Sequence, residues 1–169
     1  FWFGGKRMAL VTLAPSKIEA RITERTKAIL AGNTNGHPAK WSELQAIAKA
    51  HDLPVIEDST EAIGSKYQGA LVGTFGAASV LDFSQPFALT CGEGGMVVTD
   101  DVDIAVAVRR HRSHRLDERA SVVVSSSASH QAVMSDVTAA LGLAQLRRID
   151  EILERLRQER ERLGQPQVL

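Results

Sequence analysis

The sequence predicts an α/β domain, a layered fold in which helices flank a mostly parallel sheet. Segments with the composition of strands alternate with segments of helical periodicity along most of the 169 residues. One expected strand, residues 53–56, is continuously apolar, which is typical of a parallel strand covered on both faces. With 44% hydrophobic residues, the chain is long enough for one core and its length calls for no second domain.

The first half of the chain is expected to begin with a strand in the apolar run at residues 7–13. Pro15 and Ser16 then indicate the start of a short helix that runs through residue 22. A second apolar run at residues 27–31 is closed by the turn-forming cluster at residues 32–38. The spacing of the apolar residues from Trp41 to Ala48 predicts an amphipathic helix before the strand at residues 53–56.

The second half is expected to hold two further strands, at residues 77–83 and 96–99, and two helices. Asp100 and Asp101 suit the start of the first helix. Residues 121–129 have no helical period and indicate a loop. One long helix is predicted over residues 135–163, because Ser135 is a good N-cap and an apolar seam follows from Leu146.

Composition and charge exclude several classes of function. The 20 basic and 20 acidic residues cancel, so the chain has no overall field that would attract nucleic acid or an anionic membrane. The single cysteine, Cys91, excludes an internal disulfide and fits a reducing, cytoplasmic setting. No apolar run reaches the roughly 18 residues of a membrane-spanning helix. Since the chain opens at Phe1 without a methionine, we expect it to be a piece of a longer protein.

Two acids, Glu57 and Asp58, directly follow the apolar strand at residues 53–56. The carboxyl ends of parallel strands form the edge at which open α/β sheets bind ligands. We therefore expect the functional site at this edge. An alternative for Asp58, taken without its neighbours, is a residue that braces a loop or a helix start.

Five motifs occur in order along the chain, at residues 22–29 (ITERTKAI), 55–62 (VIEDSTEA), 67–73 (YQGALVG), 91–99 (CGEGGMVVT) and 134–146 (MSDVTAALGLAQL). Their order and spacing resemble the DegT/DnrJ/EryC1/StrS sugar aminotransferases. The resemblance implies that residues 1–169 are part of the large domain of a fold type I transferase that uses pyridoxal phosphate (PLP). It also implies a homodimer that transfers an amino group to a keto group of a nucleotide-linked sugar, as in polysaccharide or antibiotic sugar biosynthesis.

The resemblance assigns cofactor-binding positions to individual residues. Asp58 stands where the family places the acid that keeps the pyridine nitrogen protonated, so that the ring can accept electrons. Glu61 stands where the family usually has a glutamine that can donate to the cofactor's phenolic oxygen. Asp82 aligns with a serine that commonly binds the cofactor phosphate, which an aspartate would repel. Gln131 replaces an asparagine that reaches the partner subunit's phosphate.

The position of the Schiff-base lysine is the largest departure from the family pattern. Counting back from Gly92 places Phe87 there, or Pro86 if the loop differs by one residue in length, and neither has an amine. Lys66 is the last lysine of the chain. Val133 stands where the family has an arginine. A related branch of dehydratases has histidine in place of the lysine, but Phe87 cannot act as a base either.

Other reactive side chains have simpler interpretations. His37, His51 and Cys91 lack partners at metal-ligand spacing, so we expect no metal site. Glu93 lies in a Gly-Glu-Gly-Gly run that is more typical of a tight turn than of a catalytic acid. The basic run at residues 109–115 fits the solvated end of a helix better than an anion site. The serines at 125–127 have no nucleophile motif around them.

Two hypotheses of different classes follow. The first is an enzyme of the sugar aminotransferase lineage with Asp58 as the partner of the pyridine ring. The second is a non-catalytic relative that keeps the fold for assembly or regulation. The combined loss of the lysine, asparagine and arginine positions favours the second hypothesis for this chain.

Overall fold

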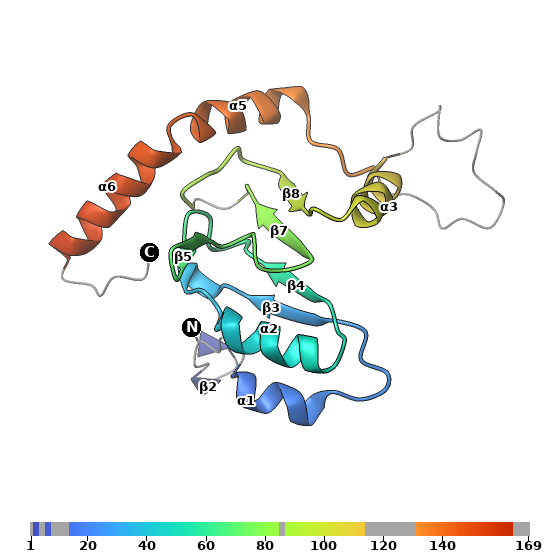
Figure 1. Cartoon of the computed structure of the whole chain (residues 1–169). Helices are drawn as coiled ribbons and strands as arrows, with labels where there is room; N and C mark the ends of the chain where they lie inside the picture. The colour runs from blue at the N-terminus through green and yellow to red at the C-terminus, as the bar shows by residue number, and fades with distance from the viewer. Residues whose placement is uncertain (1, 4–5, 8–13, 85–86, 114–130, 164–169) are drawn as a thin grey trace, which may run out of the picture.

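The centre of the molecule is a four-stranded sheet with the order β3-β4-β7-β8. A computed structural model describes residues 2–3, 6–7, 14–84, 87–113 and 131–163 (Figure 1). The strands are β3 (Ile29–Gly32), β4 (Val55–Asp58), β7 (Ala78–Asp82) and β8 (Gly95–Val98). β3, β4 and β7 are parallel, and β8 is antiparallel to β7. The expected α/β class with a mostly parallel sheet is confirmed.

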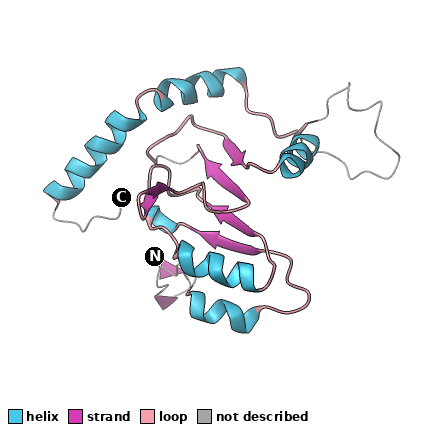
Figure 2. Ribbon diagram, viewed as in Figure 1, coloured by secondary structure: helices cyan, strands magenta, loops and turns pink. Residues whose placement is uncertain are grey.

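Two short antiparallel pairs accompany this sheet (Figure 2). β1 (Trp2–Phe3) pairs with β2 (Lys6–Arg7), and β5 (Lys66–Tyr67) pairs with β6 (Ala70–Leu71). Residues 8–13 of the strand expected over 7–13 lie outside the described residues. The expected strand at residues 53–56 begins two residues later than its apolar run, so Glu57 and Asp58 are its last two residues.

One face of the sheet packs against helices to form the main core. α1 (Pro15–Ile18) continues into a 3-10 helix, η1 (Glu19–Arg21), and the amphipathic helix predicted around Trp41 is α2 (Trp41–Ala50). Trp41 and Leu44 of α2 are fully buried. Their buried partners are Ile29, Ala31, Ala39, Ala48 and Val55. The large apolar side chains of α2 therefore fix the sheet from this side.

The opposite face of the sheet is open among the described residues. Because side chains alternate along a strand, Leu30, Ile56, Val80 and Val97 share this face through their pairings. Leu30 is 61% exposed, Val97 40% and Val80 37%. This apolar face is a surface that the described part of the chain leaves uncovered.

α3 (Val102–Arg112) begins where the sequence indicated. The Asp101 carboxylate accepts hydrogen bonds from the backbone N–H groups of Asp103 and Ile104, at 2.8 and 3.1 Å. This is the N-cap geometry that satisfies the free amides of a first helical turn. None of the described helices, α3 included, is long and apolar enough to cross a membrane. The loop expected at residues 121–129 lies outside the described residues.

The single helix expected over residues 135–163 is two helices, α5 (Asp136–Leu146) and α6 (Ile149–Arg162) (Figure 1). The N-cap was predicted correctly, since Ser135 Oγ accepts from Thr138 N at 3.2 Å. The helix ends because Arg148 leaves the helical region, with φ −112° and ψ 11°. Its side chain bonds to Glu151 in the first turn of α6. That hydrogen bond, the charge of Arg148 and the charge of Arg155 lower the pKa of Glu151.

The bend lets both helices dock where β4 and β7 end. On α5, Gly142 lies beside Cys91, so that an added Cβ would be 3.6 Å from the cysteine Cβ. On α6, the buried Leu153 fills the space above Gly64, where an added Cβ would be 2.6 Å from a leucine methyl. Gly64 therefore sets how closely α6 approaches the sheet, whereas the spacing at Gly142 would also admit a Cβ.

We predict that Gly64→Ala destabilises the chain more than Gly69→Ala. Both glycines have a positive φ, +89° and +86°, so both substitutions carry the strain of a left-handed alanine, about 1 kcal/mol. Only Gly64 has a neighbour in the way, because nothing lies within 4 Å of an added Cβ at Gly69. Overpacking adds about 1–3 kcal/mol at Gly64. Urea unfolding followed by circular dichroism measures both. If both variants lose the same free energy of unfolding, Leu153 moves aside without cost and the prediction is wrong.

Candidate functional site

The carboxyl ends of β3, β4 and β7 meet at one edge of the sheet. The ladder continues to the ends of the strands, since Asn33 N donates to Asp58 O and Ser59 N donates to Val80 O, both at 2.9 Å. Asp58 lies opposite Val80, and Asp82 follows two residues later on the same face. Asp58 and Asp82 are therefore about 7 Å apart along the strands and about 5 Å apart across them. The two predicted cofactor residues share one face of this edge.

Glu57, on the other face, is the most constrained side chain of the edge. It is fully buried, and its Oε1 accepts hydrogen bonds from Asn33 Nδ2 at 2.8 Å, Ser59 Oγ at 2.9 Å and Gly73 N at 2.6 Å. Its Oε2 accepts from Phe75 N at 2.9 Å. A buried carboxylate needs such donors, because no water replaces them. Glu57 therefore joins the turns after β3 and β4 to the segment that leads into β7.

Asn33 extends this network to the start of α2. Its side chain is 1% exposed, and its Oδ1 accepts from Ala39 N at 2.8 Å and from Trp41 Nε1 at 3.0 Å. Trp41 stacks on Phe75 with ring centroids 5.3 Å apart, and Tyr67 meets the same ring edge-on at 5.7 Å. Asn33 and Glu57 were not among the site residues predicted from the sequence. Together Asn33 and Glu57 fix the positions of α2, the turns at the sheet edge and the aromatic cluster relative to one another.

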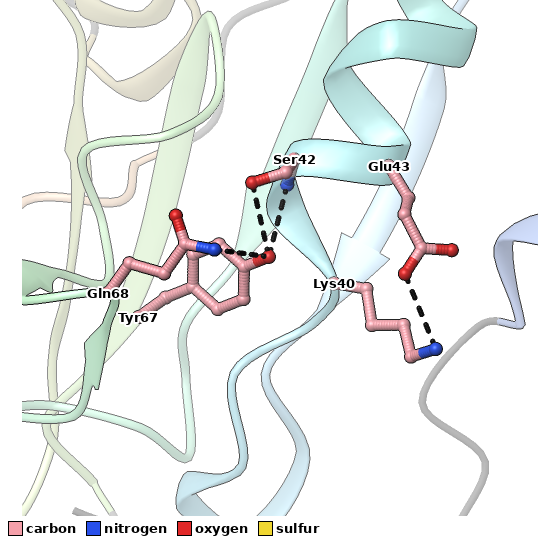
Figure 3. A network of polar contacts seen from close by, with 5 residues as sticks. All are labelled: Lys40, Ser42, Glu43, Tyr67 and Gln68. Atoms are coloured by element: carbon pink, nitrogen blue, oxygen red, sulfur yellow. Dashed lines mark hydrogen bonds and ion pairs between the residues drawn. The ribbon is translucent and has the colours of Figure 1, made fainter.

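The network ends at the surface beside the first turn of α2 (Figure 3). Tyr67 Oη donates to Ser42 Oγ at 3.2 Å and accepts from Ser42 N at 3.5 Å and Gln68 Nε2 at 3.4 Å. Lys40 and Glu43 form an ion pair of 3.3 Å on the same turn. Both side chains of that pair are exposed, so the pair contributes little stability.

Asp58, the predicted partner of the pyridine nitrogen, is half-buried at the end of β4. Its Oδ1 accepts from Thr60 Oγ1 at 2.7 Å and from Thr60 N at 3.2 Å. Its Oδ2 makes no hydrogen bond with any described residue, so one oxygen is available to a ligand. Asp58 thus also braces its own turn, which is the alternative that the sequence offered.

The other two predicted anionic positions, Glu61 and Asp82, accept hydrogen bonds from the segments that follow β3 and β7. Glu61 Oε2 accepts from Asn35 N at 2.8 Å, where Asn35 has a left-handed φ of 51°. Asp82 accepts from Ser84 N at 2.9 Å and from Ser84 Oγ at 2.7 and 2.9 Å. A carboxylate accepts from these donors without a counterion. Asp58, Glu61 and Asp82 therefore add three acidic groups to this edge and no basic one.

Phe87 lies on the loop that connects β7 to β8, with 37% of its side chain exposed. The ends of this loop are held together, because Phe83 N donates to Gly94 O and Cys91 N donates to Phe83 O, both at 2.9 Å. Phe83 and Cys91 are buried in a second cluster with Leu89. Lys66, the last lysine, lies in β5 on a different segment. The described residues place no amine on the loop that carries the lysine position.

The remaining predicted positions stay separate from this edge network. Gln131 is exposed and makes no hydrogen bond with a described residue, and Val133 is 48% exposed. Gly92 and Gly94 have φ values of +85° and +145°, so the Gly-Glu-Gly-Gly run forms the tight turn that we expected. No group of three or more possible metal ligands occurs within the described part of the chain.

The fold of this chain is that of part of the large domain of a fold type I PLP-dependent transferase. Its mixed sheet carries acids at the carboxyl edge of the parallel strands. The chain belongs to the DegT/DnrJ/EryC1/StrS aminotransferase family, whose model matches residues 7–166. The family resemblance that the sequence motifs carried is thereby confirmed.

Individual relatives match most of this chain. It is 38% identical over 156 residues to GDP-perosamine synthase of Escherichia coli O157:H7, covering 86% of this chain and 40% of that protein. The structure of DesI in the presence of its TDP-sugar product superposes with a TM-score of 0.76 and 32% identity, over 86% of this chain and 36% of that one. The structure of Helicobacter pylori PseC, an aminotransferase involved in the biosynthesis of pseudoaminic acid, superposes with a TM-score of 0.72 and 32% identity. This superposition covers 82% of this chain and 38% of PseC. The chain thus spans about two fifths of the length of these relatives.

The residues present do not fit PLP as this lineage holds it. Asp58 has a free oxygen for the pyridine nitrogen, but Phe87 offers no amine for covalent attachment. Asp82 stands where a phosphate-binding hydroxyl is expected, and an aspartate repels a phosphate. We therefore assign no reaction step to this chain through that cofactor.

We predict that Glu57→Gln lowers the free energy of unfolding by about 1–3 kcal/mol, because an amide NH₂ must face at least one of the four donors. Glu57→Ala leaves all four donors unpaired and should cost more. Glu93→Gln is the matched control, since Glu93 is exposed on its turn and the change should stay within about 0.5 kcal/mol. The free energy of unfolding of each variant is measured by urea unfolding. A Glu57→Gln variant as stable as the Glu93→Gln control would mean that the network is dispensable.

Proposed function

We propose that this chain is a non-catalytic relative of the nucleotide-sugar aminotransferases, which keeps the scaffold and has lost covalent cofactor chemistry. The observation that carries the proposal is Phe87 at the lysine position, together with the absence of lysine from residues 67–169. When bound, PLP supplies an electron sink in its protonated ring. A phenyl ring can neither form the covalent link to PLP nor move a proton.

Charge at the sheet edge supports the same proposal. Asp58 and Asp82 each use a carboxylate oxygen to brace their own turn, and Glu61 uses one to accept from Asn35 N. Their negative charges disfavour a phosphate nearby, and Val133 and Gln131 supply no cation to offset them. The sheet edge therefore keeps the strand arrangement of the family. Its acidic side chains, however, make the electrostatic potential unfavourable for the phosphate of PLP.

The class of ligand and the assembly are part of the proposal. Relatives whose names and structures include GDP-perosamine and a TDP-sugar support a nucleotide-linked sugar as the ligand of the parent protein. The uncovered apolar surfaces of the sheet and of α5 support pairing of two copies. The lone Cys91 is buried and fits a cytoplasmic setting.

The enzyme hypothesis is the second candidate, and one observation favours it. Asp58 Oδ2 has no hydrogen bond among the described residues, which supports a role as the partner of a pyridine nitrogen. A pocket that had lost only its amine would need one substitution to recover. This difference makes the two candidates separable by experiment.

We predict that the chain forms no specific covalent adduct with PLP. The protein is mixed with PLP, its visible spectrum is recorded before and after borohydride, and the reduced sites are located by peptide mapping. Slow, unsaturable modification of surface lysines is expected. The GDP-perosamine synthase of Escherichia coli O157:H7, treated with PLP and borohydride in the same way, is the comparison protein. A saturable adduct at one lysine of this chain would contradict the proposal.

We predict that Phe87→Lys alone restores little PLP binding. The comparison is with a variant that also carries Glu61→Gln, Asp82→Ser, Gln131→Asn and Val133→Arg, in a protein long enough to form the complete site. Each lost charge-assisted contact is worth roughly 1.5–3 kcal/mol, so two of them make the single variant about a hundredfold weaker or more. Phe87→Lys with Asp82→Ser isolates the phosphate repulsion. Tight binding and amino transfer by Phe87→Lys alone would show an intact pocket that lacks one group.

A further inference from the structure

The loop that joins β3 to α2 carries both asparagines of the chain, Asn33 and Asn35 (Figure 1). It includes a short 3-10 helix, η2 (Thr34–Gly36). Asn33 is buried and is followed by Thr34, whereas Asn35 is exposed and is followed by Gly36. The two amides therefore share one loop but differ in exposure and in the residue that comes next.

The side-chain amide of Asn33 is bonded through both its nitrogen and its oxygen. Its Nδ2 donates to Glu57 Oε1 at 2.8 Å and to Ser59 Oγ at 2.9 Å. Its Oδ1 accepts from Ala39 N at 2.8 Å and from Trp41 Nε1 at 3.0 Å. An amide held in this way cannot turn toward the backbone of the next residue without breaking several buried hydrogen bonds.

Asn35 lacks these side-chain restraints. Its amide makes no hydrogen bond with any described residue, although its backbone N–H donates to Glu61 Oε2 at 2.8 Å. Gly36 has no Cβ to shield its backbone nitrogen, and its φ is +80°. An exposed asparagine before a glycine is the pair in which a backbone nitrogen can most easily attack a side-chain amide.

We propose that Asn35 is a site of spontaneous deamidation and that Glu61 sets its rate by holding the turn. The backbone nitrogen of Gly36 loses its proton and bonds to Cγ of Asn35, and the Cγ–Nδ2 bond breaks. Nδ2 leaves as ammonia with the proton, and a cyclic imide joins the two residues. Water then opens the imide at either carbonyl, which gives aspartate or isoaspartate at position 35. Apart from water the reaction needs no co-reactant, and no atom is oxidised or reduced.

The backbone of Asn35 is the restraint that the reaction must overcome. Its φ is 51° and its ψ is 39°, and at this ψ the Gly36 nitrogen points away from the side chain. The ring closes only after ψ has changed. The left-handed region is unfavourable for residues other than glycine, so the hydrogen bond to Glu61 helps to keep Asn35 there.

The turn can open without unfolding the sheet edge. Asn33 holds both ends of the loop, because its N–H donates to Asp58 O at 2.9 Å and its Oδ1 accepts from Ala39 N. Between these points the turn depends on the Glu61 contact and on a bond of 3.0 Å from His37 N to Thr34 O. Opening of such a turn is local and costs less than global unfolding.

The reaction changes the contact with Glu61. Either product places a new carboxylate on the residue whose N–H Glu61 accepts, and like charges at this range repel. Isoaspartate also lengthens the main chain by one atom, inside a loop whose two ends Asn33 holds. Deamidation therefore releases Glu61 from the turn and adds negative charge to an acidic edge. The proposal is independent of the loss of PLP chemistry, which the borohydride experiment decides separately.

Mass spectrometry of the folded chain tests the site. Trypsin releases residues 28–40, a peptide that contains both asparagines. Incubation at mildly alkaline pH should make this peptide about 1 Da heavier at Asn35 and leave Asn33 unchanged. Conversion should be faster at higher pH, because the Gly36 nitrogen must lose its proton. Asn35→Gln is the control and should remove the change, since glutamine closes the corresponding ring far more slowly.

The chain unfolded in urea is the reference for an unrestrained turn. An Asn35 that stays intact in the folded chain after the unfolded chain has been converted would overturn the proposal. Conversion of Asn33 as fast as Asn35 in the folded chain would also overturn it, because burial and bonding would then give no protection.

Two substitutions at the same position test the role of Glu61. Glu61→Ala removes the acceptor and should speed conversion of Asn35 in the folded chain about fivefold or more. Glu61→Gln keeps an oxygen that can accept from Asn35 N, so its rate should stay near the original one. Both variants should match the unchanged chain in urea, where the contact is absent. Equal rates for Glu61→Ala and the unchanged folded chain would overturn the role assigned to Glu61.

Discussion

A buried carboxylate with four hydrogen-bond donors, Glu57, fixes the edge of the sheet on which the candidate site is built. Its donors come from the turn after β3, the turn after β4 and the segment before β7. Removing the carboxylate would leave these groups buried without partners, which costs more than each bond contributes when made. Through Asn33 and Trp41 the same network sets the position of α2, and with it the main core.

The two faces of this edge have different roles. Glu57 points into the covered face and is satisfied by neutral donors, so it acts as a structural group. Asp58 and Asp82 share the other face, where each braces a turn through a hydroxyl of Thr60 or Ser84. The stability of this scaffold depends on the covered face, so the fold can accommodate Phe87 and Asp82 outside that face.

The helical arm follows a related principle. α6 approaches the sheet closely because Gly64 leaves room for Leu153, while Gly142 of α5 lies at an ordinary contact distance from Cys91. Docking through small residues keeps the larger apolar side chains of α5 on the outside, between Asp136 and Arg147. These apolar side chains remain exposed among the described residues. The open face of the sheet, with Leu30 and Val80, adds to the apolar area left uncovered.

The sequence by itself determined the strands around residues 53–56, 77–83 and 96–99, the helix that begins at Trp41, the N-caps at Asp101 and Ser135, and the family, because local periodicity and motif spacing encode these features. Tertiary structure decided what no local pattern shows. Glu57 alternates with Asp58 and shares its face with Val55, yet its burial depends on donors up to 24 residues away in the chain, as in Asn33. The helices on either side of Arg148 likewise contact Cys91 and Gly64, which lie far from them in sequence. Long-range packing, unlike periodicity, cannot be read one segment at a time.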